Sequence, residues 1–202
     1  MRIDKQLKLV IPIYDDDADP SAKPPKPASL RAVIHSEPIS SDVFDTYFEP
    51  IAQVFTEIHA GRYTSISGPK IADKLLRKAS VAMGIWDSDS RSGRVGVKDG
   101  LIEEIHRLTN VLAPGKQGWR QLMLQEAKDE ILSPREAEEV DAMLVFFTVS
   151  SHMYPRQDLR VALDGAMSLR GARVEYSSFS ELKASLPTLS APESSGATAA
   201  GS

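Results

Sequence analysis

The stretch Ser133–Met153, SPREAEEVDAMLVFFTVSSHM, decides the fold expected of this chain. Ser133 suits a helix N-cap, Pro134 suits the first helical position, and Glu136 completes a capping box with Ser133. From Met143 to Val149 the segment is apolar at nearly every position. A helix that is apolar on all sides in a soluble chain is buried on all sides. The stretch therefore predicts a central helix with other helices packed around it.

A strand is the alternative reading of the same segment, because Ala142–Val149 is rich in β-branched and aromatic residues. The capping box at Ser133 and Glu136 favours the helix. On a helix, Phe147 shares one face with Val140 and Leu144, and we expect its side chain to be fully buried.

Length and composition are those of one ordinary globular domain. The 202 residues are 42% hydrophobic and 26% charged, with a formal net charge of −4. A mildly acidic chain is a poor candidate for nucleic-acid binding. The absence of cysteine excludes disulfides, thiolate catalysis and cysteine metal sites. No stretch approaches the roughly 20 apolar residues that a membrane helix needs, so we expect a protein of the cytoplasm.

The first 40 residues predict a small β-hairpin that packs on the same domain. In residues 3–14, five apolar residues share one parity, Ile3, Leu7, Leu9, Ile11 and Ile13, which is typical of a half-buried strand. Leu30–Ile34 alternates again. Pro12 lacks an N–H group and is expected at a strand edge or near the strand's end. The connection, residues 15–27, contains four prolines and reads as an exposed loop. Three adjacent aspartates in it lack the glycine and the distal glutamate of a calcium-binding loop.

Residues 41–189 predict a helical domain around the central helix, and residues 190–202 a disordered tail of small and polar residues. The segment GKQGW, which ends at Trp119, is expected to be a loop. The other expected helices are Ser41–Ala60, Ser67–Met83, Lys98–Leu112, Leu122–Ile131, Pro155–Gly171 and Phe179–Leu186. The fold prediction is thus a mainly α, bundle-like domain with a small N-terminal hairpin.

The first of these helices carries the candidate partner-binding residues. Its apolar stripe is rich in aromatics and is interrupted by Pro50, which should kink or split the helix near Glu49. A helix kinked by proline can leave a groove in which another amphipathic helix docks. The candidates are Phe44, Tyr47, Phe48 and Phe55. The alternative is that all four are ordinary core residues.

The sequence shows no catalytic, cofactor or metal motif. The histidines, His35, His59, His106 and His152, have no metal-ligand spacing, and His59 and His106 are expected at the surface. Serine elbows and phosphate-binding glycine loops are absent. We therefore expect no cofactor and a non-enzymatic protein, although catalytic groups can come from distant parts of a chain.

Several stretches together resemble tail assembly chaperones of long-tailed, non-contractile bacteriophages, or phage proteins encoded beside the tail-tube gene. They span roughly residues 1–190 and are packing and turn segments without a catalytic signature. They read MRIDKQLKLVIPI, VIHSEPIS, GPKIADKLLRKASVAMGIW, GLIEEIHRLTNVLAPGKQGW, AMLVFFTVSS (142–151) and ELKASLPTL.

The resemblance implies a protein of the host cell cytoplasm that is absent from the finished particle. Such a protein binds the helical tape measure protein, keeps it soluble and helps tail-tube subunits polymerise around it. Many members occur in a short form and a longer, frameshifted form. Small members are largely helical, and the N-terminal hairpin with its Pro-rich loop departs from that pattern. Self-association into a homo-oligomer is compatible with the sequence.

Two other classes of function compete with this hypothesis. One is a structural virion protein of the tail: a terminator, a connector or a minor tail component. The other is a small enzyme or regulator whose site carries no sequence motif, which would need a deep pocket with convergent polar groups.

Overall fold

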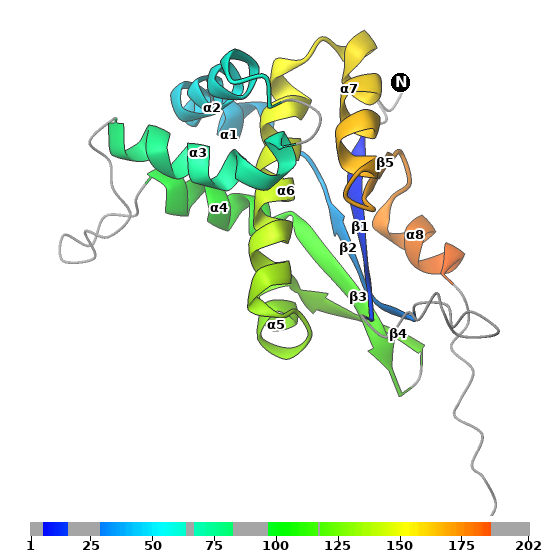
Figure 1. Ribbon diagram of the computed structural model, residues 1–202. Coiled ribbons are helices and arrows are strands. Elements are labelled where there is room, and N and C mark those ends of the chain that lie inside the picture. Colours follow the sequence, from blue (N-terminus) through cyan, green and yellow to red (C-terminus); the bar gives the residue numbers. More distant parts are fainter. Residues whose placement is uncertain (1–5, 16–28, 64–66, 83–96, 117, 187–202) are drawn as a thin grey trace, which may run out of the picture.

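The computed structural model describes residues 6–15, 29–63, 67–82, 97–116 and 118–186 (Figure 1). These residues form eight helices and five strands. The helices are α1 (Ser41–Thr46), α2 (Phe48–Ala60), α3 (Gly68–Ala82), α4 (Val97–Arg107), α5 (Leu124–Glu130), α6 (Pro134–Met153), α7 (Arg156–Ser168) and α8 (Phe179–Ser185). The strands are β1 (Lys8–Tyr14), β2 (Leu30–Ser36), β3 (Thr109–Gly115), β4 (Gly118–Met123) and β5 (Arg173–Glu175).

The strands form one antiparallel sheet in the order β4-β3-β2-β1-β5. The predicted hairpin of β1 and β2 is its centre, with Ile11 opposite Ile34. β5 pairs only with Lys8–Val10, so Pro12 lies where β1 has a neighbour on one side only. A residue without an N–H group is tolerated at such an open edge.

Both faces of the sheet are covered. Alternate residues of each strand, such as Ile11, Ile34 and Val111, belong to the main core together with the long helices. The intervening residues Val10 and Val33 belong to a smaller second core beneath α8. β1 is therefore buried on two sides, and not half-buried as its alternation suggested.

The predicted central helix is confirmed. α6 begins at Pro134 with the Ser133–Glu136 capping box and packs against α2, α3, α4, α7 and β1. Figure 1 shows it between the group α1–α4 on one side and α7 on the other. Every residue from Ala142 to Ser150 is buried, and Phe147 is 0% exposed as predicted.

The expected first helix is two helices. α1 is capped by Ser40, and the break lies at Tyr47, two residues before Glu49. Pro50 stands in the first turn of α2, where a proline costs no intrahelical hydrogen bond. Gly61 ends α2.

The fold prediction is confirmed in part. Helices outweigh strands as expected, but the sheet has five strands and is larger than an N-terminal hairpin. α4 ends at Arg107, and Thr109–Gly115 is strand β3 where the helix was expected to continue. In the expected loop GKQGW, Gly115 is the last residue of β3, and Gly118 and Trp119 begin β4. Residues 41–189 are therefore not a purely helical region, and the protein is a mixed α/β domain.

The error at β3 has an identifiable cause. Leu108 and Leu112 continue the helical spacing of Leu101 and Ile105, but Leu112 points into the second core while Val111 belongs to the main core. Side chains of successive residues point to opposite faces in a strand, and not in a helix. Gly118 closes the β3–β4 turn with a φ of 107°, a conformation that glycine adopts without steric cost. Most of the Pro-rich loop and the predicted disordered tail, residues 190–202, lie outside the described residues.

Candidate partner-binding surface

A cluster of aromatic rings lies where α1 and α2 meet the C-terminal end of α6. The ring of Phe44 stacks on His152, with centroids 4.9 Å apart, and meets the ring of Phe48 edge-on at 5.7 Å. His152 Nε2 donates a hydrogen bond to the carbonyl oxygen of Ile39 over 3.1 Å. The end of α6 is thereby tied to the segment that leads into α1.

The cluster continues along α2 to the residue after α6. The ring of Phe55 meets the ring of Tyr154 edge-on, with centroids 5.3 Å apart. It lies tilted against the ring of His59, with centroids 4.0 Å apart. His59 Nδ1 lies 2.9 Å from the carbonyl oxygen of Phe55, and Nε2 lies 3.0 Å from the Tyr154 hydroxyl. Because the carbonyl can only accept, His59 Nδ1 donates to it and Nε2 accepts from the hydroxyl. Burial raises the pKa of Tyr154, which keeps this donor protonated.

None of the four predicted residues is fully buried. Phe44, Tyr47 and Phe55 are partly buried and pack against the edge of the main core. Phe48 is on the surface, with 52% of its area exposed. The alternative that all four are ordinary core residues therefore does not fit Phe48. We use the name aromatic surface for Phe44, Phe48, Phe55, His59, His152 and Tyr154.

Sequence reasoning missed the three members of this surface that are not phenylalanine. His152 and Tyr154 come more than ninety positions after the α1–α2 residues they contact, as the 95-residue separation of His59 and Tyr154 shows. The sequence did place both residues at the end of a buried helix. Side chains at such a position emerge from the core and can contribute to a surface. His59 was correctly expected at the surface, but its partners were not foreseen.

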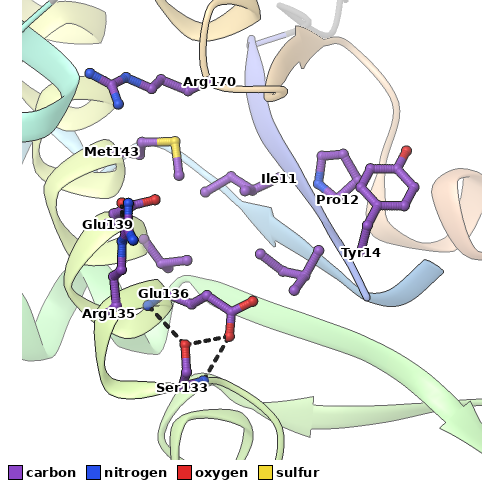
Figure 2. Close-up of a pocket in the computed structure, with 11 residues that line it drawn as sticks. Ile11, Pro12, Tyr14, Ser133, Arg135, Glu136, Glu139, Met143 and Arg170 are labelled. Atoms are coloured by element: carbon purple, nitrogen blue, oxygen red, sulfur yellow. Dashed lines mark hydrogen bonds and ion pairs between the residues drawn. The ribbon is translucent and has the colours of Figure 1, made fainter. Parts of the chain in front are cut away.

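A pocket of about 370 Å³ lies elsewhere, between the open edge of β1 and the start of α6 (Figure 2). Four of its polar side chains interact in two pairs, Ser133 with Glu136 and Arg135 with Glu139. Glu136 accepts hydrogen bonds from the backbone and hydroxyl of Ser133 and pairs with Arg31. Arg135 pairs with Glu139 over 3.3 Å. These contacts secure the first turns of α6, and we assign the pocket no ligand.

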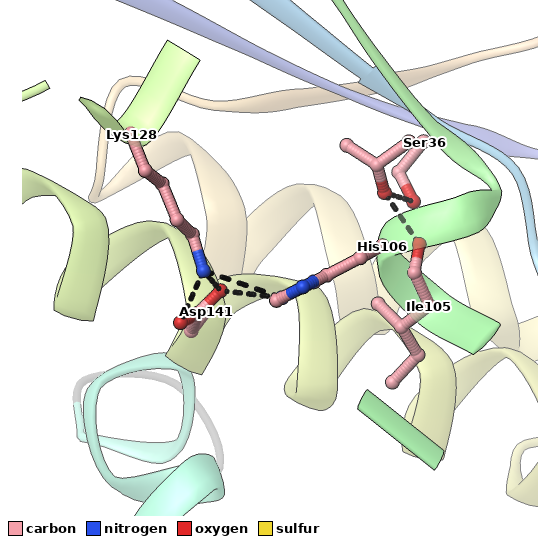
Figure 3. A network of polar contacts seen from close by, with 6 residues as sticks. Ser36, Ile105, His106, Lys128 and Asp141 are labelled. Atoms are coloured by element: carbon pink, nitrogen blue, oxygen red, sulfur yellow. Dashed lines mark hydrogen bonds and ion pairs between the residues drawn. The ribbon is translucent and has the colours of Figure 1, made fainter. Parts of the chain in front are cut away.

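A second polar group joins α4, α5 and α6 (Figure 3). Lys128 Nζ lies 2.7 Å from both carboxylate oxygens of Asp141, and His106 Nε2 lies 2.9 Å from one of them. Burial opposes the charge of Asp141, but the hydrogen bonds from His106 and Lys128 outweigh it and lower the pKa of this carboxyl. The arrangement is that of an ion pair between packed helices, and we treat it as structural.

Figure 3 also shows how the end of α4 is tied to the sheet. Thr109 Oγ1 lies 2.8 Å from the carbonyl oxygen of Ile105 and 2.9 Å from Ser36 Oγ. In the described ranges, no group of three or more histidine, aspartate and glutamate side chains is placed to hold a metal ion. None of the described helices is long and apolar enough to span a membrane.

Comparison with protein-family models, with curated proteins and with solved structures finds no match to this chain.

Proposed function

We propose that this protein is a non-enzymatic tail assembly chaperone of a long-tailed bacteriophage, which binds the tape measure protein and helps tail-tube subunits polymerise around it. It acts in the host cell cytoplasm and is absent from the mature virion. The proposal rests on the resemblance of the six stretches given above and on one structural observation, the partly exposed aromatic surface.

The observation that carries the proposal is the ring of Phe48. This large apolar side chain is 52% exposed, and its ring meets the partly buried ring of Phe44 edge-on. Aromatic anchors of this kind, surrounded by half-buried apolar area, are typical of protein-binding surfaces. A tape measure protein exposes apolar helical stripes until the tube encloses it, and such stripes dock on apolar surfaces through residues spaced by three and four.

Co-expression with the tape measure protein of the same phage tests the proposal. We expect the tape measure protein to stay in the soluble fraction and to co-purify with this chain. Phe48→Asp should abolish both effects, because a carboxylate in the contact would be desolvated without a partner. Val161→Asp is the matched control, since Val161 is 78% exposed on α7, which lies on the other side of α6 (Figure 1).

Two outcomes contradict the proposal. One is a tape measure protein that precipitates equally with and without this chain. The other is equal loss of solubility with Phe48→Asp and Val161→Asp, which would show that the aromatic surface is not the contact.

Mass spectrometry of purified phage particles separates the chaperone from its alternative. A chaperone should be missing from the particles or present in traces. A tail terminator, connector or minor tail component would be present at a fixed stoichiometry, and that result would replace the chaperone proposal with the virion-protein one.

A further inference from the structure

The part of the aromatic surface on α1 and the start of α2 stands in a segment that is rich in negative charge. Between residues 32 and 61 the chain contains no lysine or arginine, whereas it contains five acidic residues. Two of these are paired within the protein, Glu37 with Lys8 and Glu57 with Lys78. The other three, Asp42, Asp45 and Glu49, are exposed on α1 and the first turn of α2.

Within the described residues, the carboxylates of Asp42, Asp45 and Glu49 form no ion pair or side-chain hydrogen bond. The helix dipole accounts for Asp42 and Glu49, which stand in first turns. It does not account for Asp45, which stands in the last turn of α1, where a negative charge is disfavoured. Local helix stability therefore does not explain the whole set.

Two of these charges are chain neighbours of rings in the aromatic surface. Asp45 follows Phe44 in the chain, Glu49 follows Phe48, and the two rings are in contact with each other at 5.7 Å. The surface thus presents apolar area with carboxylates beside it. Its electrostatic complement is an apolar stripe with lysine or arginine beside it, and a cation over an aromatic face gains further stabilisation.

We propose that the segment bound by the aromatic surface is a basic amphipathic helix, with apolar residues spaced by three and four and with lysine or arginine along both borders of the stripe. This inference rests on the proposed function and specifies the chemistry of the partner. It also gives the surface a selectivity, because an amphipathic helix bordered by glutamate meets like charges and is repelled.

Two synthetic amphipathic helices test it, with the same leucine stripe and with either lysine or glutamate along its borders. Binding of fluorescently labelled peptide is measured by anisotropy at low and at high salt. We expect the lysine peptide to bind at least about tenfold more tightly at low salt, and the preference to shrink at high salt because exposed charges are screened.

The charge variant is Asp42→Asn, Asp45→Asn and Glu49→Gln combined. It should lose the preference for the lysine peptide and keep the salt-independent part of the binding. Its matched control neutralises three exposed carboxylates on other helices, Glu103→Gln on α4, Glu138→Gln on α6 and Asp158→Asn on α7, and should keep the preference. Because all six side chains are exposed, both triple variants should fold, which circular dichroism checks.

Equal binding of the two peptides by the unaltered protein overturns the inference, as does a preference that survives the charge variant. Failure of both peptides to bind overturns it as well. None of these results contradicts the chaperone proposal. The co-expression experiment tests that proposal separately, because apolar contacts alone can keep the natural partner soluble.

Discussion

The middle and the end of α6 use the same kind of side chain for different purposes. In the middle, Phe146 and Phe147 are buried in the main core, with exposures of 3% and 0%. At the end, His152 and Tyr154 contact the partly buried rings of Phe44 and Phe55. Phe48, which contacts Phe44, is half exposed. Residue type does not separate a packing aromatic from a candidate contact aromatic. The surroundings of the ring separate the two. Mutations in α6 and in the helices packed against it can measure the difference.

The largest effect on stability is expected from Phe147→Ala in the middle of α6. Removing a fully buried ring costs about 3–5 kcal/mol of unfolding free energy, from lost burial and from the cavity left behind. Urea unfolding followed by circular dichroism measures the loss. An unchanged midpoint would mean that this ring is not part of the core, and the contrast between the two parts of α6 would fail.

The next effect tests how tightly the middle of α6 is packed. Gly68 begins α3, and a methyl group there would lie 2.7 Å from Phe146 Cε2 and 2.8 Å from the carbonyl oxygen of Tyr63. Gly68→Ala should therefore destabilise the protein by about 1–3 kcal/mol, because neither the buried ring nor the backbone can yield easily. Gly165→Ala on α7 is the control, since nothing lies within 4 Å of the added methyl group. Gly165→Ala should be neutral or stabilising by about 1 kcal/mol. Equal melting temperatures for the two variants would contradict close packing at Phe146.

The sequence predicted the helices and strands whose pattern lies within one contiguous segment. It did not predict those that depend on contacts between separate segments. The capping box at Ser133 and the apolar run after it are contiguous, and they located α6 correctly. The ends of β3 and β4 depend on pairing between residues that no local pattern connects, such as Val111 with Leu122, and β5 has only three residues in which alternation can appear. Helical spacing that continued by coincidence from Leu108 to Leu112 then extended α4 too far.

Three of the six residues of the aromatic surface, Phe44, Phe48 and Phe55, were among the candidates named from the sequence. Phe44, Tyr47, Phe48 and Phe55 are contiguous enough to be read as one stripe, and the structure places all four outside the fully buried core. Their different exposures follow from the break at Tyr47, whose effect on the direction of each ring is a tertiary property. The histidine and tyrosine partners come from contacts across more than ninety residues, which one sequence does not reveal.

A smaller, pH-dependent effect is expected at Asp141, on the polar side of α6 before its apolar middle. Asp141→Asn should cost about 1–3 kcal/mol at pH 7, because Lys128 then loses the charge that it pairs with. The pKa of Asp141 is lowered in the folded protein, so its contribution is present above the unfolded value of about 3.9 and is lost as pH falls through the folded pKa.

Urea unfolding of the Asp141→Asn variant and the unaltered protein at pH 7 and near pH 3 measures this. The difference in unfolding free energy should be largest at pH 7 and should shrink at the lower pH. Glu138→Gln, at an exposed position on the same helix, should change little at either pH. A difference that is the same at both pH values would show that the charge of Asp141 contributes nothing and that only its shape matters.

The smallest effect on stability is expected from Phe48→Asp. The same variant is expected to have the largest effect on binding. Phe48 is the first residue of α2, and in Phe48→Asp the new carboxylate lies where the helix dipole favours negative charge. That gain offsets the lost edge-on contact with Phe44, so the unfolding free energy should change by no more than about 1 kcal/mol. Thermal unfolding of Phe48→Asp and of Phe147→Ala compares the stability cost of the two changes within one protein. If Phe48→Asp destabilises the fold as much as Phe147→Ala does, its ring is a core residue in solution, and any loss of tape measure binding in this variant would reflect unfolding. If its stability is retained while binding is lost, the end of α6 carries a contact surface that the stability of the domain does not require.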